Sequence, residues 1–119
     1  NTAIFWMPLR NNALGGRTSY YESRPSAGVE TFVAMSNPQA SVATSITLEI
    51  TDSALRRNSV SLPLDAGRGT IMTLRELAGS ASIAETGWLR FAATQGVIAM
   101  TWVYDAPAGR VYPVPVQPE

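Results

Sequence analysis

The sequence predicts an all-β fold, an antiparallel β-sandwich of immunoglobulin-like or jelly-roll type with one short connecting helix. Apolar and polar residues alternate with a period of two along most of the chain, as they do in half-buried strands. Gly, Pro, Asn and Asp separate these segments at intervals of roughly 8–12 residues, which is typical of sandwiches. The chain shows no alternation of strands and helices, which is the pattern that predicts a parallel sheet. A chain of 119 residues is expected to form a single domain over residues 1–119, because domains commonly have about 100–150 residues.

The central strands show the most regular pattern. Residues 44–51 place Thr44 and three aliphatic side chains on one face and four polar side chains on the other. The pair Asp52-Ser53 predicts a turn, because an Asp side chain hydrogen-bonds to the nearby backbone. Residues 58–64 alternate in the same way, with Pro63 on the solvent side. The segment Asp65–Gly69 predicts the next turn, and a strand over residues 70–74 follows it.

One short helix is predicted over residues 73–78. Thr73 is a candidate N-cap, and Glu76 three residues later completes the pattern of a capping box. Gly79 is a stop signal, because glycine readily adopts the conformation that ends a helix. A helix of this length serves as a connector across the end of a sandwich, and residues 80–86 are expected to form a loop after it.

Further strands are expected on both sides of this region. Residues 87–94 and 97–104 flank the turn signal Gln95-Gly96, which predicts a hairpin between them. Residues 97–104 are apolar on both faces, which predicts a central strand or one covered on both sides. The remaining extended segments are expected at residues 3–9, 17–22, 29–35 and 110–116.

The composition excludes several kinds of site. The chain has no Cys, His or Lys, which excludes disulfides, thiolate nucleophiles, Cys-ligated metals, His bases and Schiff-base lysines. No two carboxylates fall at a spacing that demands a catalytic pair, and no calcium-loop pattern occurs. We therefore predict no catalytic, cofactor or metal site and do not expect an enzyme. The formal net charge of zero provides no field to attract nucleic acid, and no apolar run reaches the roughly 18 residues that membrane insertion requires.

The segment 29–106 resembles a known kind of module. The residues that carry this resemblance are Glu30–Pro38, the alternating strand up to Ser53, Leu62–Arg68, Leu74–Leu77, Gly87–Phe91 and Val97–Ala99. In this order they resemble the immunoglobulin-like β-sandwich modules that are repeated in bacterial secreted and cell-surface proteins. They are also similar to the small β-sandwich of the sensory-rhodopsin transducer family, a soluble oligomer. The resemblance covers about two-thirds of the chain and implies the fold more than a function.

Both ends of the chain are candidate interface segments. Residues 3–9 are apolar on both alternating faces, which is costly at a terminus unless another surface covers them. They either pack within their own sandwich or contact a second subunit. At the other end, Pro113 and Pro115 remove hydrogen-bond donors from one edge of the strand only. This segment is either an ordinary edge strand or an arm that adds to a neighbour's sheet. The predicted interface residues are Ile4, Phe5, Trp6, Met7, Tyr112, Val114 and Val116.

Aromatic side chains offer an alternative kind of site. Exposed aromatic rings stack on sugars, and the candidate ligand aromatics are Trp6, Tyr20, Tyr21 and Tyr104. The alternation favours Trp88 and Trp102 as core residues instead. The arginines are spread along the chain and are interpreted as a solvated surface.

Together these features predict a non-enzymatic structural or interaction module of a bacterial secreted or cell-surface protein. We expect it to self-associate through terminal or edge strands, as a homo-oligomer or with another protein. A carbohydrate-binding module that uses exposed aromatics is one alternative. A soluble, transducer-like signalling partner is another, and a cytoplasmic location would favour it.

Overall fold

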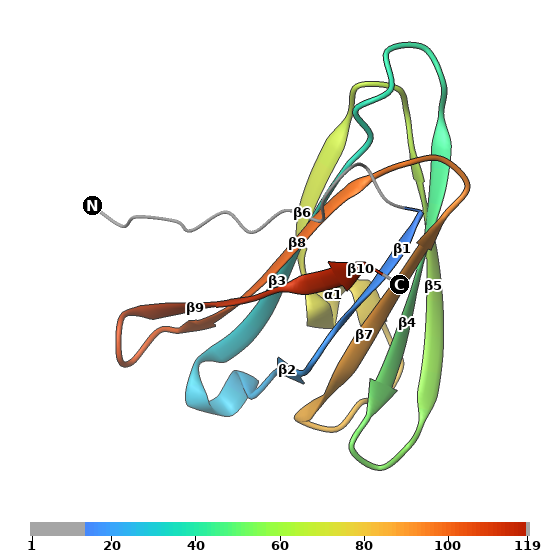
Figure 1. Cartoon of the computed structure of the whole chain (residues 1–119). Helices are drawn as coiled ribbons and strands as arrows, with labels where there is room; N and C mark the ends of the chain where they lie inside the picture. The colour runs from blue at the N-terminus through green and yellow to red at the C-terminus, as the bar shows by residue number, and fades with distance from the viewer. Residues whose placement is uncertain (1–13, 119) are drawn as a thin grey trace.

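The computed structural model describes residues 14–118, which form two antiparallel β-sheets packed face to face (Figure 1). Sheet A has the strand order β10-β1-β7-β4-β5, with β2 also paired to β7, and sheet B has the order β6-β3-β8-β9. The predicted all-β sandwich with one short helix is confirmed. The strands of sheet A are β1 (Gly15–Thr18), β2 (Tyr21–Glu22), β4 (Thr44–Asp52), β5 (Arg57–Leu64), β7 (Thr86–Ala93) and β10 (Val116–Pro118). Those of sheet B are β3 (Val29–Ser36), β6 (Gly69–Thr73), β8 (Ile98–Asp105) and β9 (Arg110–Val114).

The core lies between the two sheets and follows the predicted alternation. β4 directs its aliphatic side chains inward, where they meet Val33 and Met35 of β3 and Leu89 and Phe91 of β7. All of these side chains are at most 2% exposed. Since burying one large aliphatic or aromatic side chain contributes about 1.5–3 kcal/mol, this layer dominates the stability of the sandwich.

The predicted helix is confirmed as α1 (Leu74–Ala78), which follows the short 3-10 helix η2 (Pro25–Ala27) in chain order. The Thr73 side chain accepts a hydrogen bond from the Glu76 N–H, and the Glu76 carboxylate accepts one from the Thr73 N–H, so the capping box is complete. Leu74, Leu77 and Ala78 are buried, and the helix fills space between the two sheets (Figure 1). No helix in the described part of the chain is long and apolar enough to cross a membrane.

The predicted hairpin between residues 87–94 and 97–104 is wrong. β7 pairs with β4 and β1 in sheet A, whereas β8 pairs with β3 and β9 in sheet B. Leu89 and Phe91 of β7 are buried in the same core as Ala99 of β8. The two strands contribute to this core from opposite sides, because each lies in a different sheet. The Gln95-Gly96 signal marks a change of chain direction but does not determine which strand becomes the lateral partner.

The C-terminal segment also divides between the sheets. β9 pairs with β8 at the edge of sheet B, and β10 pairs with β1 at the edge of sheet A. The chain crosses from sheet B to sheet A at Pro115, which has no N–H to donate to a neighbouring strand. The predicted strand 17–22 divides in a similar way into β1 and β2, with Ser19 and Tyr20 between them.

The β4–β5 turn is built around the buried carboxylate of Asp52. This carboxylate accepts hydrogen bonds from the backbone N–H groups of Ala54 (3.0 Å), Arg56 (2.9 Å) and Ala84 (2.8 Å), and from the Arg56 guanidinium (2.8 Å). Burial by itself would raise the pKa of Asp52, but the hydrogen bonds from Ala84 and Arg56 hold it below its ordinary value. The predicted turn at residues 52–53 is therefore confirmed, and Asp52 also ties it to the loop before β7.

Candidate functional site

The outer face of sheet B carries a continuous set of apolar side chains, which we call the apolar face. Outward positions alternate with core positions along each strand, and the outward residues of neighbouring strands lie directly opposite one another. Ala34 of β3 is opposite both Ile71 of β6 and Met100 of β8, and Phe32 is opposite Trp102. The apolar face consists of Phe32, Ala34, Ile71, Ile98, Met100, Trp102 and Tyr104.

The apolar face has a hollow at one end and an aromatic cluster beside it. The hollow has a volume of 540 Å³, and its walls include Ala34, Ile71, Ile98 and Met100. Next to it, the rings of Phe32 and Trp102 are parallel, with centroids 5.7 Å apart and an interplanar angle of 3°. Tyr104 meets Phe32 edge to face at 6.5 Å. The side chain of Ile71 is 59% exposed.

Sheet A and α1 lie on the other side of sheet B (Figure 1). Within residues 14–118, no strand or helix is stacked on the apolar face. Ile71 and Tyr104 are its exposed residues, Phe32, Ile98 and Trp102 are half-buried, and Ala34 and Met100 are buried among them. Contiguous apolar surface that reaches solvent is uncommon on monomeric proteins and marks interaction sites. The apolar face is therefore the candidate functional site.

The predicted interface residues have different positions. Ile4, Phe5, Trp6 and Met7 lie outside the described residues. Tyr112 is exposed on the edge strand β9. Val114 and Val116 were expected at an interface, but they are buried within their own sandwich, where the Val114 carbonyl accepts a hydrogen bond from the Thr101 hydroxyl at 2.7 Å. Their side chains turn inward because the chain crosses between the sheets at this point.

The candidate ligand aromatics do not form one site. Trp6 lies outside the described residues, Tyr104 belongs to the apolar face, and Tyr20 is 40% exposed in the bend between β1 and β2. Tyr21 cannot serve as an exposed aromatic, because its side chain is fully buried and its hydroxyl donates to the Ala84 carbonyl at 2.9 Å. Burial and the nearby carboxylate of Asp52 raise the pKa of Tyr21 to about 12.

The expectation that Trp88 and Trp102 lie in the core is wrong. Leu89 and Phe91 occupy the inward positions of β7, so Trp88 lies on the outer face of sheet A. Thr101 and Val103 likewise occupy inward positions of β8, which directs Trp102 outward. The apolar stretch 97–104 was the sequence signal for the apolar face. It predicts a central strand or one covered on both sides, and β8 is central in sheet B, between β3 and β9.

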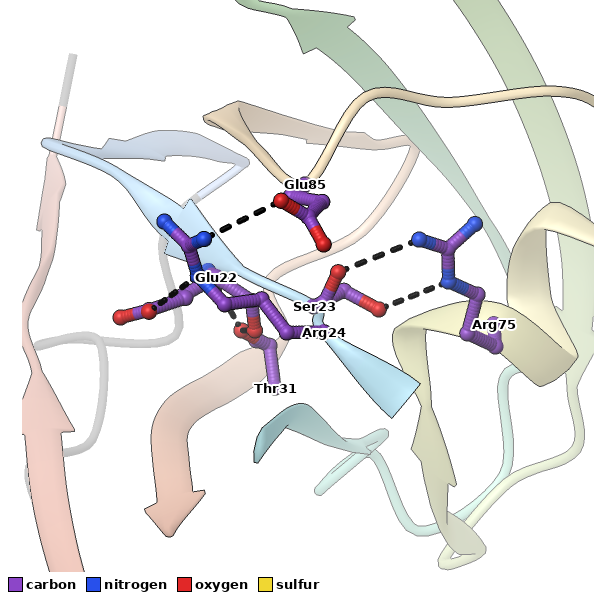
Figure 2. A network of polar contacts seen from close by, with 6 residues as sticks. All are labelled: Glu22, Ser23, Arg24, Thr31, Arg75 and Glu85. Atoms are coloured by element: carbon purple, nitrogen blue, oxygen red, sulfur yellow. Dashed lines mark hydrogen bonds and ion pairs between the residues drawn. The ribbon is translucent and has the colours of Figure 1, made fainter. Parts of the chain in front are cut away.

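A polar network joins β2, β3, α1 and the loop before β7 (Figure 2). The Arg75 guanidinium donates to the Ser23 hydroxyl at 2.8 Å and to the Ser23 carbonyl at 3.1 Å. Arg24 forms ion pairs with Glu22 at 2.7 Å and with Glu85 at 3.1 Å. The Thr31 hydroxyl donates to the Glu22 carbonyl at 2.7 Å and accepts from the Glu22 N–H.

The chemistry of this network is structural. Its guanidinium groups are engaged with carboxylates, a hydroxyl and a carbonyl, so they hold the short strand β2 against its neighbours. Partial burial raises the pKa of the adjacent Glu30, while hydrogen bonds from Ser23 and the Thr31 N–H and the charge of Arg75 oppose this rise. Among the described residues, no group of three metal-ligating side chains occurs.

Comparisons with known proteins show the fold. No family model matches the chain, and no curated protein matches it. It is similar to the crystal structure of Thermotoga maritima 1070, with a TM-score of 0.67 and 9% sequence identity, over 89% of this chain and 93% of that one. It is also matched to FlgD from P. aeruginosa, with a TM-score of 0.37 and 11% identity, over 87% of this chain and 70% of that one.

Proposed function

We propose that this chain is a non-enzymatic interaction module that self-associates through the apolar face of sheet B. The observation that carries this proposal is the set of apolar and aromatic side chains across β6, β3 and β8, on which no strand or helix of residues 14–118 is stacked. Burying such a surface is favourable by about 25 cal/mol for each Å² removed from water. A module of a secreted or cell-surface bacterial protein is the setting that we propose for it.

The proposed occupant is the segment 3–9 of a second copy of the chain. This segment is apolar on both alternating faces, with Phe5 and Met7 on one and Ile4 and Trp6 on the other. A strand that lies on one sheet buries only one of its own faces against that sheet. The other side of segment 3–9, which is also apolar, is covered only if a second surface packs over it. The outer face of sheet B in a second copy of the chain provides that surface. The hollow of 540 Å³ lies within the range of about 300–1,000 Å³ that is usual for ligand pockets, so it can accept large apolar side chains.

The start of the described chain supports this arrangement. The Leu14 carbonyl accepts a hydrogen bond from the Ala93 N–H at 2.7 Å, at the end of β7. β8 begins on the other sheet only five residues later, at Ile98, which belongs to the apolar face. The point at which the described chain follows residues 1–13 therefore lies near the end of the sandwich that holds the hollow. Fully extended, they would span about 43 Å at about 3.3 Å per residue.

A carbohydrate-binding function fits the apolar face less well. The parallel stacking of Phe32 and Trp102 covers one face of each ring, which reduces the aromatic surface available to a sugar on sheet B. A soluble signalling partner, as in the transducer family, would also use a protein-docking surface, and a cytoplasmic location would favour it.

The test is the mass of the full chain in solution, measured by multi-angle light scattering during size-exclusion chromatography. We expect a defined oligomer, a multiple of the 12.8 kDa chain mass, that becomes a folded monomer on deletion of residues 1–9 or on Ile71→Arg. Leu55→Arg is the matched control, because Leu55 is an exposed aliphatic residue in the β4–β5 turn, away from the apolar face. This variant should keep the mass of the parent protein.

Two results would overturn the proposal. One is a folded full-length chain that remains monomeric at about 100 µM, a concentration well above the Kd of a weak specific dimer. The other is an Ile71→Arg variant whose mass equals that of the parent oligomer. If the deletion variant fails to fold, the segment belongs to its own sandwich and packs in cis, which also contradicts the proposal.

A further inference from the structure

The outer face of sheet A, on the opposite side of the molecule, has a different chemistry. In one row across the sheet, Arg17 of β1 is directly opposite Arg90 of β7, which is in turn opposite Glu49 of β4. In the next row, Thr51 of β4 lies between Trp88 of β7 and an arginine of β5. We call this set the arginine face, and it consists of Arg17, Glu49, Thr51, Arg57, Trp88 and Arg90.

The arginine face carries an unusual concentration of positive charge. Like charges directly opposite each other on adjacent strands destabilise a sheet, yet Arg17 and Arg90 occupy such a pair. Within residues 14–118, the side chains of Arg17 and Arg57 form no hydrogen bond and no ion pair. The face has three guanidinium groups and one carboxylate, in a chain whose formal net charge is zero. Local conflicts of this kind are characteristic of functional sites.

Two hollows meet at Trp88. The first has a volume of 340 Å³ and is lined by the arginine face. The second has a volume of 440 Å³ and is lined by Arg17, Thr18, Ser19, Trp88 and Gln117. Arg17 and Trp88 are walls of both, so a ligand that extends from one hollow into the other must pass over the half-buried indole. Hydroxyl and amide groups supply further hydrogen-bond partners beside the guanidinium groups.

We propose that the arginine face binds an acidic glycan, a sugar chain that carries carboxylate or sulfate groups. A guanidinium presents its donors in a planar fork that matches two oxygens of a carboxylate or sulfate, and Arg17 and Arg57 are available for this role. The indole face of Trp88 carries negative π density, on which the C–H groups of a pyranose ring can stack. Glu49 accepts hydrogen bonds from sugar hydroxyl groups. The charged group of an acidic sugar is thus held in the first hollow, while the ring of that sugar or of the next sugar in the chain lies over Trp88.

Nucleic acid fits this surface less well. Binding of single strands uses a basic groove in which successive bases stack on several aromatic side chains. The arginine face has one tryptophan, and the chain as a whole is neutral. Nucleic acid is therefore an outcome to be tested.

The experiment is isothermal titration calorimetry of the full chain at low salt with four probes. Two are acidic, a heparin-derived hexasaccharide and hexagalacturonate, and two are controls, neutral maltohexaose and single-stranded oligothymidylate. We expect both acidic sugars to bind and neither control to bind measurably. Arg17→Gln and Arg57→Gln should each weaken binding about tenfold, because each removes hydrogen bonds between two charged groups. Trp88→Leu should weaken it further. Arg110→Gln removes the same charge from β9 of sheet B and should leave the affinity unchanged.

The same experiment can overturn the proposal. Equal weakening by Arg110→Gln and Arg17→Gln would show that only net charge matters. Oligothymidylate binding as tightly as the acidic sugars, or Arg57→Gln without effect, would also contradict an acidic-sugar site. Arg57 is exposed on the edge strand β5, so its substitution tests the site even if the Trp88 variant fails to fold. Ile71→Arg on the opposite sheet should not change glycan binding, which separates this proposal from the proposed self-association.

Discussion

Replacing Gly87 with Ala tests how closely the sheet is packed where β7 lies between β2 and β4. An added Cβ atom would lie 2.6 Å from Cε2 of Tyr21 and 2.7 Å from the Cα of Asp52, and it would also meet the carbonyl oxygen of Thr51. Carbon atoms in contact prefer separations of about 3.5–4.0 Å, so each neighbour would have to move by about 1 Å. Two of these neighbours are backbone atoms. The third is a ring anchored by the hydrogen bond from its hydroxyl to Ala84.

The expected loss of stability follows from this lack of room. Overpacking a core typically costs about 1–3 kcal/mol, and contacts that no side-chain rotation can relieve place Gly87→Ala at about 3 kcal/mol. With an unfolding entropy of about 2.1 cal/mol/K per residue, a chain of 119 residues should lose about 12 °C in Tm. Thermal and urea unfolding followed by circular dichroism measure both quantities.

Gly67→Ala is the matched control for this substitution. Gly67 has a φ of +70° in the β5–β6 turn, but no atom lies within 4 Å of an added Cβ. Only backbone strain of about 1–2 kcal/mol is therefore expected there. If Gly87→Ala destabilises the protein no more than Gly67→Ala does, the steric reasoning is refuted.

Two further predictions concern polar groups. Thr73→Ala removes the capping-box hydroxyl of α1 and should cost about 1 kcal/mol in urea unfolding, whereas Thr73→Ser should cost less than half of that; equal losses would contradict the capping role. Asp52→Asn should destabilise the protein most at neutral pH. Because the pKa of Asp52 is lowered in the folded state, its stabilising contribution is present above the ordinary aspartate pKa of 3.8 and is lost as the pH falls through the folded value. The difference in Tm between the parent protein and Asp52→Asn should thus narrow below pH 3.8, and a constant difference would refute the role of the ionised carboxylate.

Much of the local structure was predictable because it depends on near neighbours in the sequence. The alternation in residues 44–51 identified β4, and the Thr73–Glu76 spacing identified the helix cap. The turns at Asp52 and Asp65 were predictable for the same reason. In each case the interacting groups are separated by only a few residues, so the pattern contains the information.

The candidate sites were less predictable. The apolar face combines outward residues of three strands, and the sequence showed only the β8 part of it, as a stretch without a polar face. The arginines were interpreted as a scattered, solvated surface. Arg17, Arg57 and Arg90 come together only because β1, β5 and β7 belong to the same sheet.

The amino-acid sequence by itself determined the fold class, the approximate strand segments and the exclusion of Cys, His and Lys chemistry. The tertiary structure decided which strands became neighbours. It separated β7 from β8, divided the C-terminal segment at Pro115 between two sheets, and directed Trp88 and Trp102 outward. The physical reason is that alternation identifies two faces of a strand but not its lateral partners. Those partners are selected by the packing of the shared core, which involves residues far apart in the chain.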